Sequence, residues 1–156
     1  MRIGLISDTH GLLRPEALDA LAGCAHIVHG GDIGDEAILD ALRKLAPVSA
    51  VRGNNDREAW ARALPAADLV EVDGAHVYVV HDLADLAIEP RAAGVVAVVS
   101  GHSHVPRVEA RDGVLYVNPG SAGPRRFRLP VTVGELTIVR GRATARIVPL
   151  SVGRPG

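Results

Sequence analysis

Side chains that can bind metal ions recur along this sequence in short motifs, each directly after an apolar run. In the first of these runs, Ile3, Leu5 and Ile6 predict a buried strand, which Asp8 and His10 follow. On an extended chain, residues i and i+2 point to the same side, so this carboxylate and this imidazole should face one point. Open α/β sheets bind ligands at the carboxyl ends of their strands. We therefore expect Asp8 and His10 to bind a common ligand.

Four further predicted strands end in loops of the same kind. The metal-capable residues of these loops are Asp32, Asn54, His81, His102 and His104. Histidines with purely structural roles would not fall so regularly at the ends of buried strands. With the first loop, the sequence offers two carboxylates, four imidazoles and one amide oxygen.

This donor set predicts a site for transition-metal ions. Nitrogen and oxygen donors without thiolate suit manganese, iron, zinc, cobalt or nickel better than calcium. A structural tetrahedral site needs only about four ligands, and the surplus suits two ions that share one carboxylate. Two ions roughly 3.5–4 Å apart can hold the attacking and leaving oxygens of an in-line displacement at phosphorus, and a hydroxide between them forms near neutral pH. Hydrolysis of a phosphate ester is therefore the expected chemistry.

Apolar periodicity predicts the elements that carry these loops. Helices are expected over 15–21, 36–45 and 83–93, and a polar irregular stretch over 57–65. Further strands are expected over 25–29, 47–51, 69–72, 76–80, 95–99, 107–110, 114–117, 131–139 and 143–148. Asp73-Gly74 and Asp112-Gly113 predict tight hairpin turns. Strands and helices alternate at short spacing near the amino terminus, which indicates an α/β fold with parallel strands.

The composition is that of a globular chain with an aliphatic core. The 156 residues indicate one domain over 1–150 and a flexible tail over 151–156. Only 3% of the residues are aromatic, so valine, leucine, isoleucine and alanine must fill the core. Cys24 is the only cysteine, which excludes a disulfide and a thiolate zinc site. We expect a cytoplasmic protein without a membrane partner, because the sequence shows neither a signal peptide nor a long apolar span.

Other chemistries find little support. A formal net charge of −1 argues against binding of long nucleic acid. The sequence contains no phosphate loop, no dinucleotide-binding glycine motif and no nucleophile elbow. The sequence is compatible with either a monomer or a homo-oligomer.

The ordered motifs resemble those of the calcineurin-like metallophosphoesterase superfamily, specifically its small bacterial and archaeal phosphodiesterase branch. The matching motifs are Asp8-x-His10, Gly31-Asp32-x-x-Asp35, Gly53-Asn54-x-Asp56, His81, Gly101-His102-x-His104 and Asn118-Pro119-Gly120-Ser121. The resemblance implies a two-sheet β-sandwich flanked by helices, the αββα arrangement of that family.

The resemblance also implies a role for each ligand. Two groups of three residues would each hold one metal ion, and Asp32 would bridge the ions. The first group is Asp8, His10 and His104, and the second is Asn54, His81 and His102. The cofactor would be two divalent ions, manganese first, with nickel, iron, zinc and cobalt as alternatives. Asp32, Asn54 and His81 are the expected catalytic residues, and a hydroxide between the ions would attack the phosphorus of a small or activated phosphate ester, most readily a diester.

Two positions depart from the family pattern. Asn55 stands where many relatives have a histidine thought to protonate the leaving group, and an amide has no proton of useful acidity. Asp82-Leu83 stands where close relatives often have Gly-His. These departures leave a second hypothesis open, that of a metal-binding protein-interaction scaffold with little catalysis, like a eukaryotic trafficking relative of the same fold.

Further polar residues have two interpretations each. Asp35 and Asp56 either orient ligand histidines or cap helices, and His29 stands behind the ligands as a further candidate. Residues 118–121 either line the site or only form a turn. Three loop arginines either contact phosphate or face solvent, namely Arg57, Arg125 and Arg126.

Overall fold

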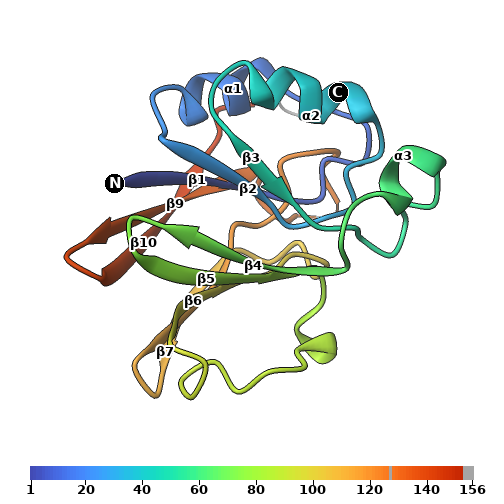
Figure 1. Cartoon of the computed structure of the whole chain (residues 1–156). Helices are drawn as coiled ribbons and strands as arrows, with labels where there is room; N and C mark the ends of the chain where they lie inside the picture. The colour runs from blue at the N-terminus through green and yellow to red at the C-terminus, as the bar shows by residue number, and fades with distance from the viewer. Residues whose placement is uncertain (127, 153–156) are drawn as a thin grey trace.

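Two five-stranded sheets pack face to face in the structure, a computed structural model that describes residues 1–126 and 128–152 (Figure 1). The first sheet has the order β10-β9-β1-β2-β3 and comprises β1 (Arg2–Ile6), β2 (His26–His29), β3 (Val48–Ala50), β9 (Thr132–Val139) and β10 (Arg142–Pro149). The second has the order β4-β5-β6-β8-β7 and comprises β4 (Ala67–Val72), β5 (Ala75–Val80), β6 (Val95–Val99), β7 (Arg107–Arg111) and β8 (Val114–Asn118). The predicted two-sheet fold class is confirmed.

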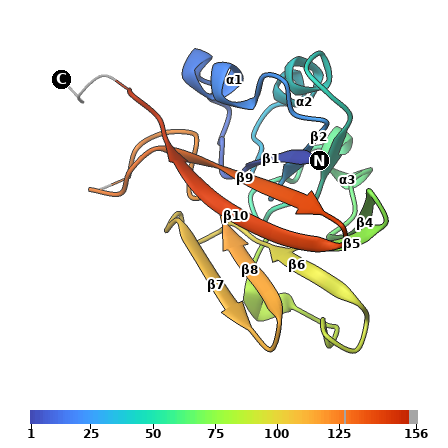
Figure 2. The same cartoon turned by 90° about the vertical axis from the view of Figure 1, so that its left-hand side faces the viewer.

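Each sheet contains three parallel strands. In the first sheet β1 pairs with β2 and β2 with β3 in parallel, while β9 and β10 extend the other side in antiparallel pairing. In the second sheet β5, β6 and β8 are parallel, and antiparallel hairpin strands complete both edges. Strand β10 packs against β7 and β8 of the second sheet, which closes one side of the sandwich (Figure 2).

Aliphatic side chains from both sheets form the main core. Ile3 and Leu5 of β1 meet Val77 and Val79 of β5 and Val99 of β6, all of them fully buried. The scarcity of aromatic residues explains this packing, because two layers of branched aliphatic side chains fill the gap between sheets without large rings.

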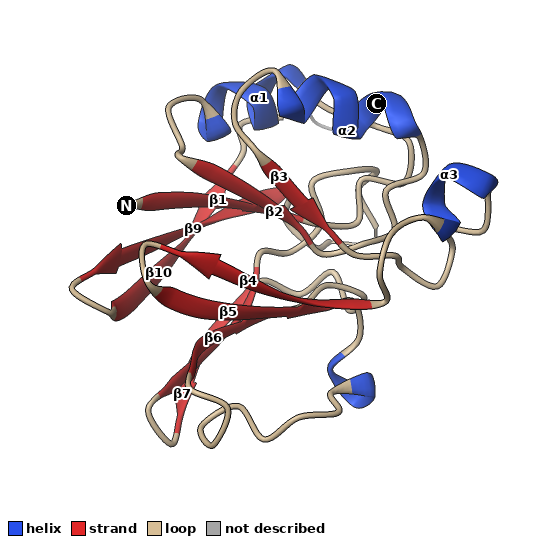
Figure 3. Ribbon diagram, viewed as in Figure 1, coloured by secondary structure: helices blue, strands red, loops and turns tan. Residues whose placement is uncertain are grey.

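Helices cover the outer face of the first sheet (Figure 3). Helix α1 (Pro15–Leu21) has proline in its first turn, and α2 (Glu36–Arg43) begins where the Asp35 carboxylate accepts a hydrogen bond from Ala37 N at 2.9 Å. Asp35 is therefore a helix cap. The buried stripe of α2 consists of Ile38, Leu39 and Leu42.

The helix predicted over 83–93 is wrong. The structure has only a single 3₁₀ turn, η1 (Leu83–Asp85), whose start is capped by the Asp82 carboxylate at Ala84 N. Pro90 lacks an N–H and disfavours the helical conformation of the residue before it, so the segment cannot continue as a helix. Leu86 and Ile88 pack instead onto the outer face of the second sheet. An irregular segment thus replaces the second helical layer of the expected αββα arrangement.

The remaining expectations fare differently. Both hairpins form around their Asp-Gly turns, in which Asp73 and Gly74 have φ of 50° and 76°. The irregular stretch over 57–65 contains the short helix α3 (Ala59–Arg62). Of the predicted tail, residues 153–156 lie outside the described part of the chain, and the domain bounds stay a prediction. In the described residues, no helix is both apolar and long enough to cross a membrane.

Candidate metal centre

The seven predicted ligands come together at one edge of the sandwich. The loops after β1, β2 and β3 bring Asp8, His10, Asp32 and Asn54 from the first sheet. The loops after β5 and β6 bring His81, His102 and His104 from the second. The site therefore spans both sheets.

Asp8 lies at the centre of the site and is fully buried. Its Oδ2 accepts hydrogen bonds from Ser7 Oγ at 2.8 Å and from His102 N at 3.1 Å. Its Oδ1 is buried and has no hydrogen-bond partner among the described residues. A buried carboxylate oxygen without a partner is costly, so this atom requires a cation or a proton donor.

Three imidazole nitrogens surround that oxygen. The Nε2 atoms of His104, His10 and His81 lie 3.4, 3.8 and 4.0 Å from Asp8 Oδ1. The two Nε2 atoms of His10 and His104 are themselves only 3.4 Å apart. Nitrogen and oxygen donors that converge at these distances fit a divalent metal ion, because an ion satisfies all of them at once.

Asp32 faces the histidines of both sheets. Its Oδ2 lies 3.7 Å from His10 Nε2 and 3.3 Å from His81 Nε2. Asn55 donates twice to this carboxylate, from its backbone N to Oδ1 at 2.9 Å and from Nδ2 to Oδ2 at 3.2 Å. Burial raises the pKa of Asp32, but hydrogen bonds from His81 and Asn55 and the nearby imidazoles outweigh it and lower the pKa to about 2. Asp32 is therefore ionised at neutral pH.

His81 is oriented by the backbone. Its Nδ1 lies 2.7 Å from Gly30 O, which can only accept, so Nδ1 carries the proton. Its Nε2 then points to the site, 3.0 Å from Asn54 Oδ1. Burial lowers the pKa of His81, but hydrogen bonds to Asp32 and Gly30 and the neighbouring carboxylates outweigh that effect and raise it. A backbone carbonyl on the far ring nitrogen is the usual support of a metal-binding histidine.

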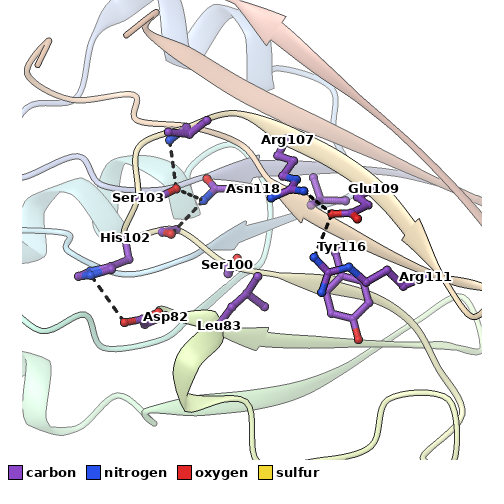
Figure 4. Close-up of a pocket in the computed structure, with 13 residues that line it drawn as sticks. Asp82, Leu83, Ser100, His102, Ser103, Arg107, Glu109, Arg111, Tyr116 and Asn118 are labelled. Carbon is purple, nitrogen blue, oxygen red and sulfur yellow. Dashed lines mark hydrogen bonds and ion pairs between the residues drawn. The ribbon is translucent and has the colours of Figure 1, made fainter. Parts of the chain in front are cut away.

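His102 is the most exposed of the four imidazoles. Its Nδ1 lies 3.3 Å from Asn54 Oδ1, and its Nε2 lies 3.6 Å from Asp82 Oδ2 (Figure 4). The Asp82 carboxylate favours the tautomer with the proton on Nε2, which leaves the Nδ1 lone pair for the site.

Two clusters of His and Asp ligand atoms emerge from these contacts. One consists of Asp8, His10 and His104, and the other of Asp8, Asp32 and His81. Asp8 belongs to both clusters, while Asp32 Oδ2 also faces histidines of both. The assignment of individual residues to individual ions stays a prediction.

The predicted ligands converge because they lie in turns after the strands, and not in the extended strands themselves. Asp8, His10, Asp32, His102 and His104 all have positive φ, between 44° and 70°. Non-glycine residues adopt this conformation uncommonly, mainly in tight turns and at functional sites. The expectation that Asp8 and His10 converge on an extended chain therefore has the wrong cause, since β1 ends at Ile6.

Several polar residues fix the loops without facing the site. The buried Asp56 carboxylate accepts hydrogen bonds from the N–H groups of Ile33, Gly34 and Gly53, which ties the loop after β2 to the loop after β3. It caps no helix. Asn118 donates from Nδ2 to Gly101 O at 2.9 Å and so holds the loop that carries two of the histidines.

Other candidates divide between support and surface. Ser121 Oγ donates to Asp8 O at 3.0 Å, so the stretch 118–121 braces the loops of the site. His29 is fully buried and bonded to Thr9 and Gly31, behind the ligands. The loop arginines are exposed and their contact with phosphate stays a prediction: Arg57, Arg125 and Arg126. Reasoning from the sequence missed Ser7 and the bonds from Asn55 to Asp32, because neither residue type marks a metal site.

Comparison with known proteins decides the family. The family model of the calcineurin-like phosphoesterase superfamily domain matches residues 1–141. The chain belongs to this superfamily. The resemblance predicted from the motifs is thereby confirmed, and as a member of the family the chain is a metal-dependent phosphoesterase.

Archaeal relatives support the assignment of this phosphoesterase. A probable metallophosphoesterase of Methanocaldococcus jannaschii is 33% identical over 163 residues, which cover 96% of this chain and 82% of the relative. A phosphodiesterase of the same organism is 28% identical over 157 residues, 87% of this chain and 92% of the relative.

Solved structures share the fold. An archaeal phosphodiesterase superposes with a TM-score of 0.77 at 24% identity, over 95% of this chain and 100% of the other. Vps29 of Chaetomium thermophilum superposes with a TM-score of 0.76 at 18% identity, over 96% and 97%. At these identities the likeness shows the fold alone.

Proposed function

We propose that this phosphoesterase is a phosphodiesterase that uses two divalent metal ions to hydrolyse small or activated phosphate esters. The observation that carries the proposal is the buried Asp8 Oδ1, which has no hydrogen-bond partner in the described part of the chain but three imidazole nitrogens within 4.0 Å. A buried carboxylate oxygen that has three imidazole nitrogens nearby but no hydrogen bond is best explained by a bound metal ion.

All seven predicted ligands enter this proposal. Asp8, His10 and His104 would hold the first ion, because their ligand atoms lie within 4.8 Å of one another. Asn54, His81 and His102 would hold the second, since Asn54 Oδ1 lies 3.0 Å from His81 and 3.3 Å from His102. Asp32 would bridge, and its Oδ2 faces His10 and His81, one histidine of each group.

The chemistry needs little from the protein beyond this arrangement. When bound, two divalent ions hold the phosphate oxygens and lower the pKa of an attacking water molecule. The carboxylates of Asp8 and Asp32 would offset half of the positive charge of the two ions, and Asn55 keeps Asp32 in place through its two hydrogen bonds. The relatives' imidazole acid has no counterpart at Asn55, so the leaving group must depart without a proton from this position. Esters with good leaving groups should therefore react fastest.

The first experiment compares two esters with the same leaving group. Metal-stripped protein receives Mn²⁺, Ni²⁺, Zn²⁺ or Mg²⁺ in turn and hydrolyses either bis(p-nitrophenyl) phosphate or p-nitrophenyl phosphate. We expect metal-restored turnover that favours the diester, most strongly with Mn²⁺. A preference for the monoester would move the assignment to a phosphatase.

A substitution tests the dinuclear part of the proposal. We expect Asp32→Asn to reduce turnover by at least about a hundredfold and to lower the number of Mn²⁺ ions bound in calorimetry, because the variant loses a ligand charge. Full activity of this variant would contradict a bridging role for Asp32.

The same experiments also test the scaffold hypothesis. The likeness to Vps29 is one of fold, and the seven ligand side chains give no separate reason to favour a scaffold. If Mn²⁺ binds but neither ester turns over, the result contradicts the proposed hydrolysis of activated esters, and the next step is a search for a protein partner.

A further inference from the structure

We propose that a planar aromatic ester substituent of the substrate binds in a hollow beside the metal centre, on the outer face of the second sheet. The hollow has a volume of about 340 Å³ and lies between the η1 turn, the loop after β6, and strands β7 and β8 (Figure 4). This volume is at the lower end of the range for small-molecule sites. The inference rests on the proposed function, because it places one arm of a diester whose phosphate lies at the metal ions.

The hollow adjoins the metal centre. Asp82 and His102 line it, and they also form the outer limit of the metal site, with His102 Nδ1 3.3 Å from Asn54 Oδ1. Asn118 lines the hollow as well and holds the loop that carries His102. A substituent on a phosphate bound at this edge therefore has a direct path into the hollow.

Apolar side chains line the hollow without being buried in the protein. Leu83 and Val105 are 39% and 46% exposed, although both lie beside a charged site. Tyr116 is half-buried and adds an aromatic ring, over which the Arg111 guanidinium lies 5.0 Å from the ring centroid. A flat aromatic group is the ligand that uses all of these features, because it can cover the aliphatic side chains and pack against a ring or a guanidinium plane.

The far end of the hollow is positively charged. Arg107 and Arg111 share one carboxylate oxygen, Glu109 Oε2, at 2.8 and 3.0 Å. Two guanidinium groups facing one carboxylate leave an excess of one positive charge and several free donors. An aromatic substituent with its own anionic group would therefore bind more tightly than a neutral one.

Inhibitors with a single substituent test this inference. The inhibitors are methylphosphinates in which a phenyl, cyclohexyl or ethyl group is joined to phosphorus by a P–C bond, which the enzyme cannot hydrolyse. They compete with bis(p-nitrophenyl) phosphate on the Mn²⁺-loaded enzyme, and calorimetry measures the same three ligands directly. We expect the phenyl compound to bind about tenfold more tightly than the ethyl compound and about threefold more tightly than the cyclohexyl compound. Equal affinities for all three would overturn the inference.

Three variants assign the effect to the hollow. Tyr116→Leu should abolish the preference for phenyl over cyclohexyl, and Leu83→Ala should weaken binding of both about threefold. Leu69→Ala is the matched control, because Leu69 is 50% exposed on β4 and does not line the hollow. Unchanged affinities in both Tyr116→Leu and Leu83→Ala would overturn the inference even if the enzyme is active. Absence of all metal-dependent turnover would instead contradict the proposed function.

Discussion

Among single residues, Asp82 has two roles, one for each of its carboxylate oxygens. Oδ1 caps the η1 turn at Ala84 N, and Oδ2 lies 3.6 Å from His102 Nε2. This arrangement holds the His102 ring with its Nδ1 toward Asn54. A carboxylate on the far nitrogen of a metal ligand contributes to affinity without touching the ion.

We therefore predict that Asp82→Asn weakens binding of the second Mn²⁺ ion about tenfold, because the amide orients the His102 imidazole less strongly. Calorimetry of metal-stripped protein measures this without reference to turnover. Asp85→Asn is the control, since it removes a charge from the same exposed segment without a contact to His102. An equal loss in both variants would mean that only the local charge matters.

His29 determines a part of the pH dependence of stability. Gly31 N donates to its Nδ1 at 3.0 Å, so this nitrogen must stay unprotonated, and burial lowers the pKa of His29 to about 4. An unfolded histidine has a pKa of about 6.5. The folded state therefore binds fewer protons, and its stability is complete above that value and falls as the pH drops toward 4.

The expected loss from this group is about 2 kcal/mol in the free energy of unfolding between pH 7 and pH 5. Urea unfolding in the presence of a chelator measures it for the natural protein and for His29→Gln, whose side chain does not titrate. The variant should lose about 2 kcal/mol less over this range. Parallel pH profiles for the two proteins would refute the assignment to His29.

At the scale of elements, the loops between strands and helices decide the site, and glycines let them approach one another. A Cβ at Gly101 would overlap Ser7 Oγ and lie 2.6 Å from Asp8 Oδ2. A Cβ at Gly53 would overlap the Asp32 carboxylate and its backbone. At both positions the backbone of one loop lies against a carboxylate of another loop, which leaves no room for a side chain. The sequence motifs therefore contain glycine at these positions.

Gly101→Ala should consequently displace Asp8 and weaken Mn²⁺ binding at least about tenfold. Gly141→Ala is the matched control, because a Cβ there meets nothing within 4 Å and the residue lies in the β9–β10 turn. The control should lose some stability from its φ of 75° but should bind Mn²⁺ normally. Normal metal affinity in Gly101→Ala would show that the loops can separate without disturbing Asp8.

Local sequence patterns predict these elements where the cause of structure is local. The Asp-Gly turns and the apolar run over Val95–Val99 follow from neighbouring residues and were predicted, and the cap at Asp35 was one of its two interpretations. The helix predicted after Asp82 does not form. The spacing of its apolar residues resembles that of a helix, but Pro90 interrupts the segment. The role of Asn55 depends on a contact with Asp32, 23 residues away, which no local pattern shows.

For the whole molecule, the decisive feature is that the candidate site joins two sheets. The first sheet supplies Asp8, His10, Asp32 and Asn54, and the second supplies the three remaining histidines. Opposed carboxylates and imidazoles at this edge are compatible with folding alone, but an ion that binds ligands from both sheets adds a link between them. Metal binding should therefore stabilise the entire sandwich rather than one loop.

Mn²⁺ at about one hundred times its dissociation constant should add about 2.7 kcal/mol of stability per ion bound. For a chain of this size this corresponds to a rise in Tm of about 5–10 °C, and a chelator should reverse it. Scanning calorimetry measures the shift, with Ca²⁺ at the same concentration as the control, because this nitrogen-rich donor set suits Ca²⁺ poorly. The rise should shrink in Asp32→Asn and in Asp8→Asn alike, since each carboxylate contributes to a cluster with histidines of the second sheet. An undiminished rise in both variants would place the stabilising ion elsewhere in the molecule, and the link between the sheets would then have to come from packing alone.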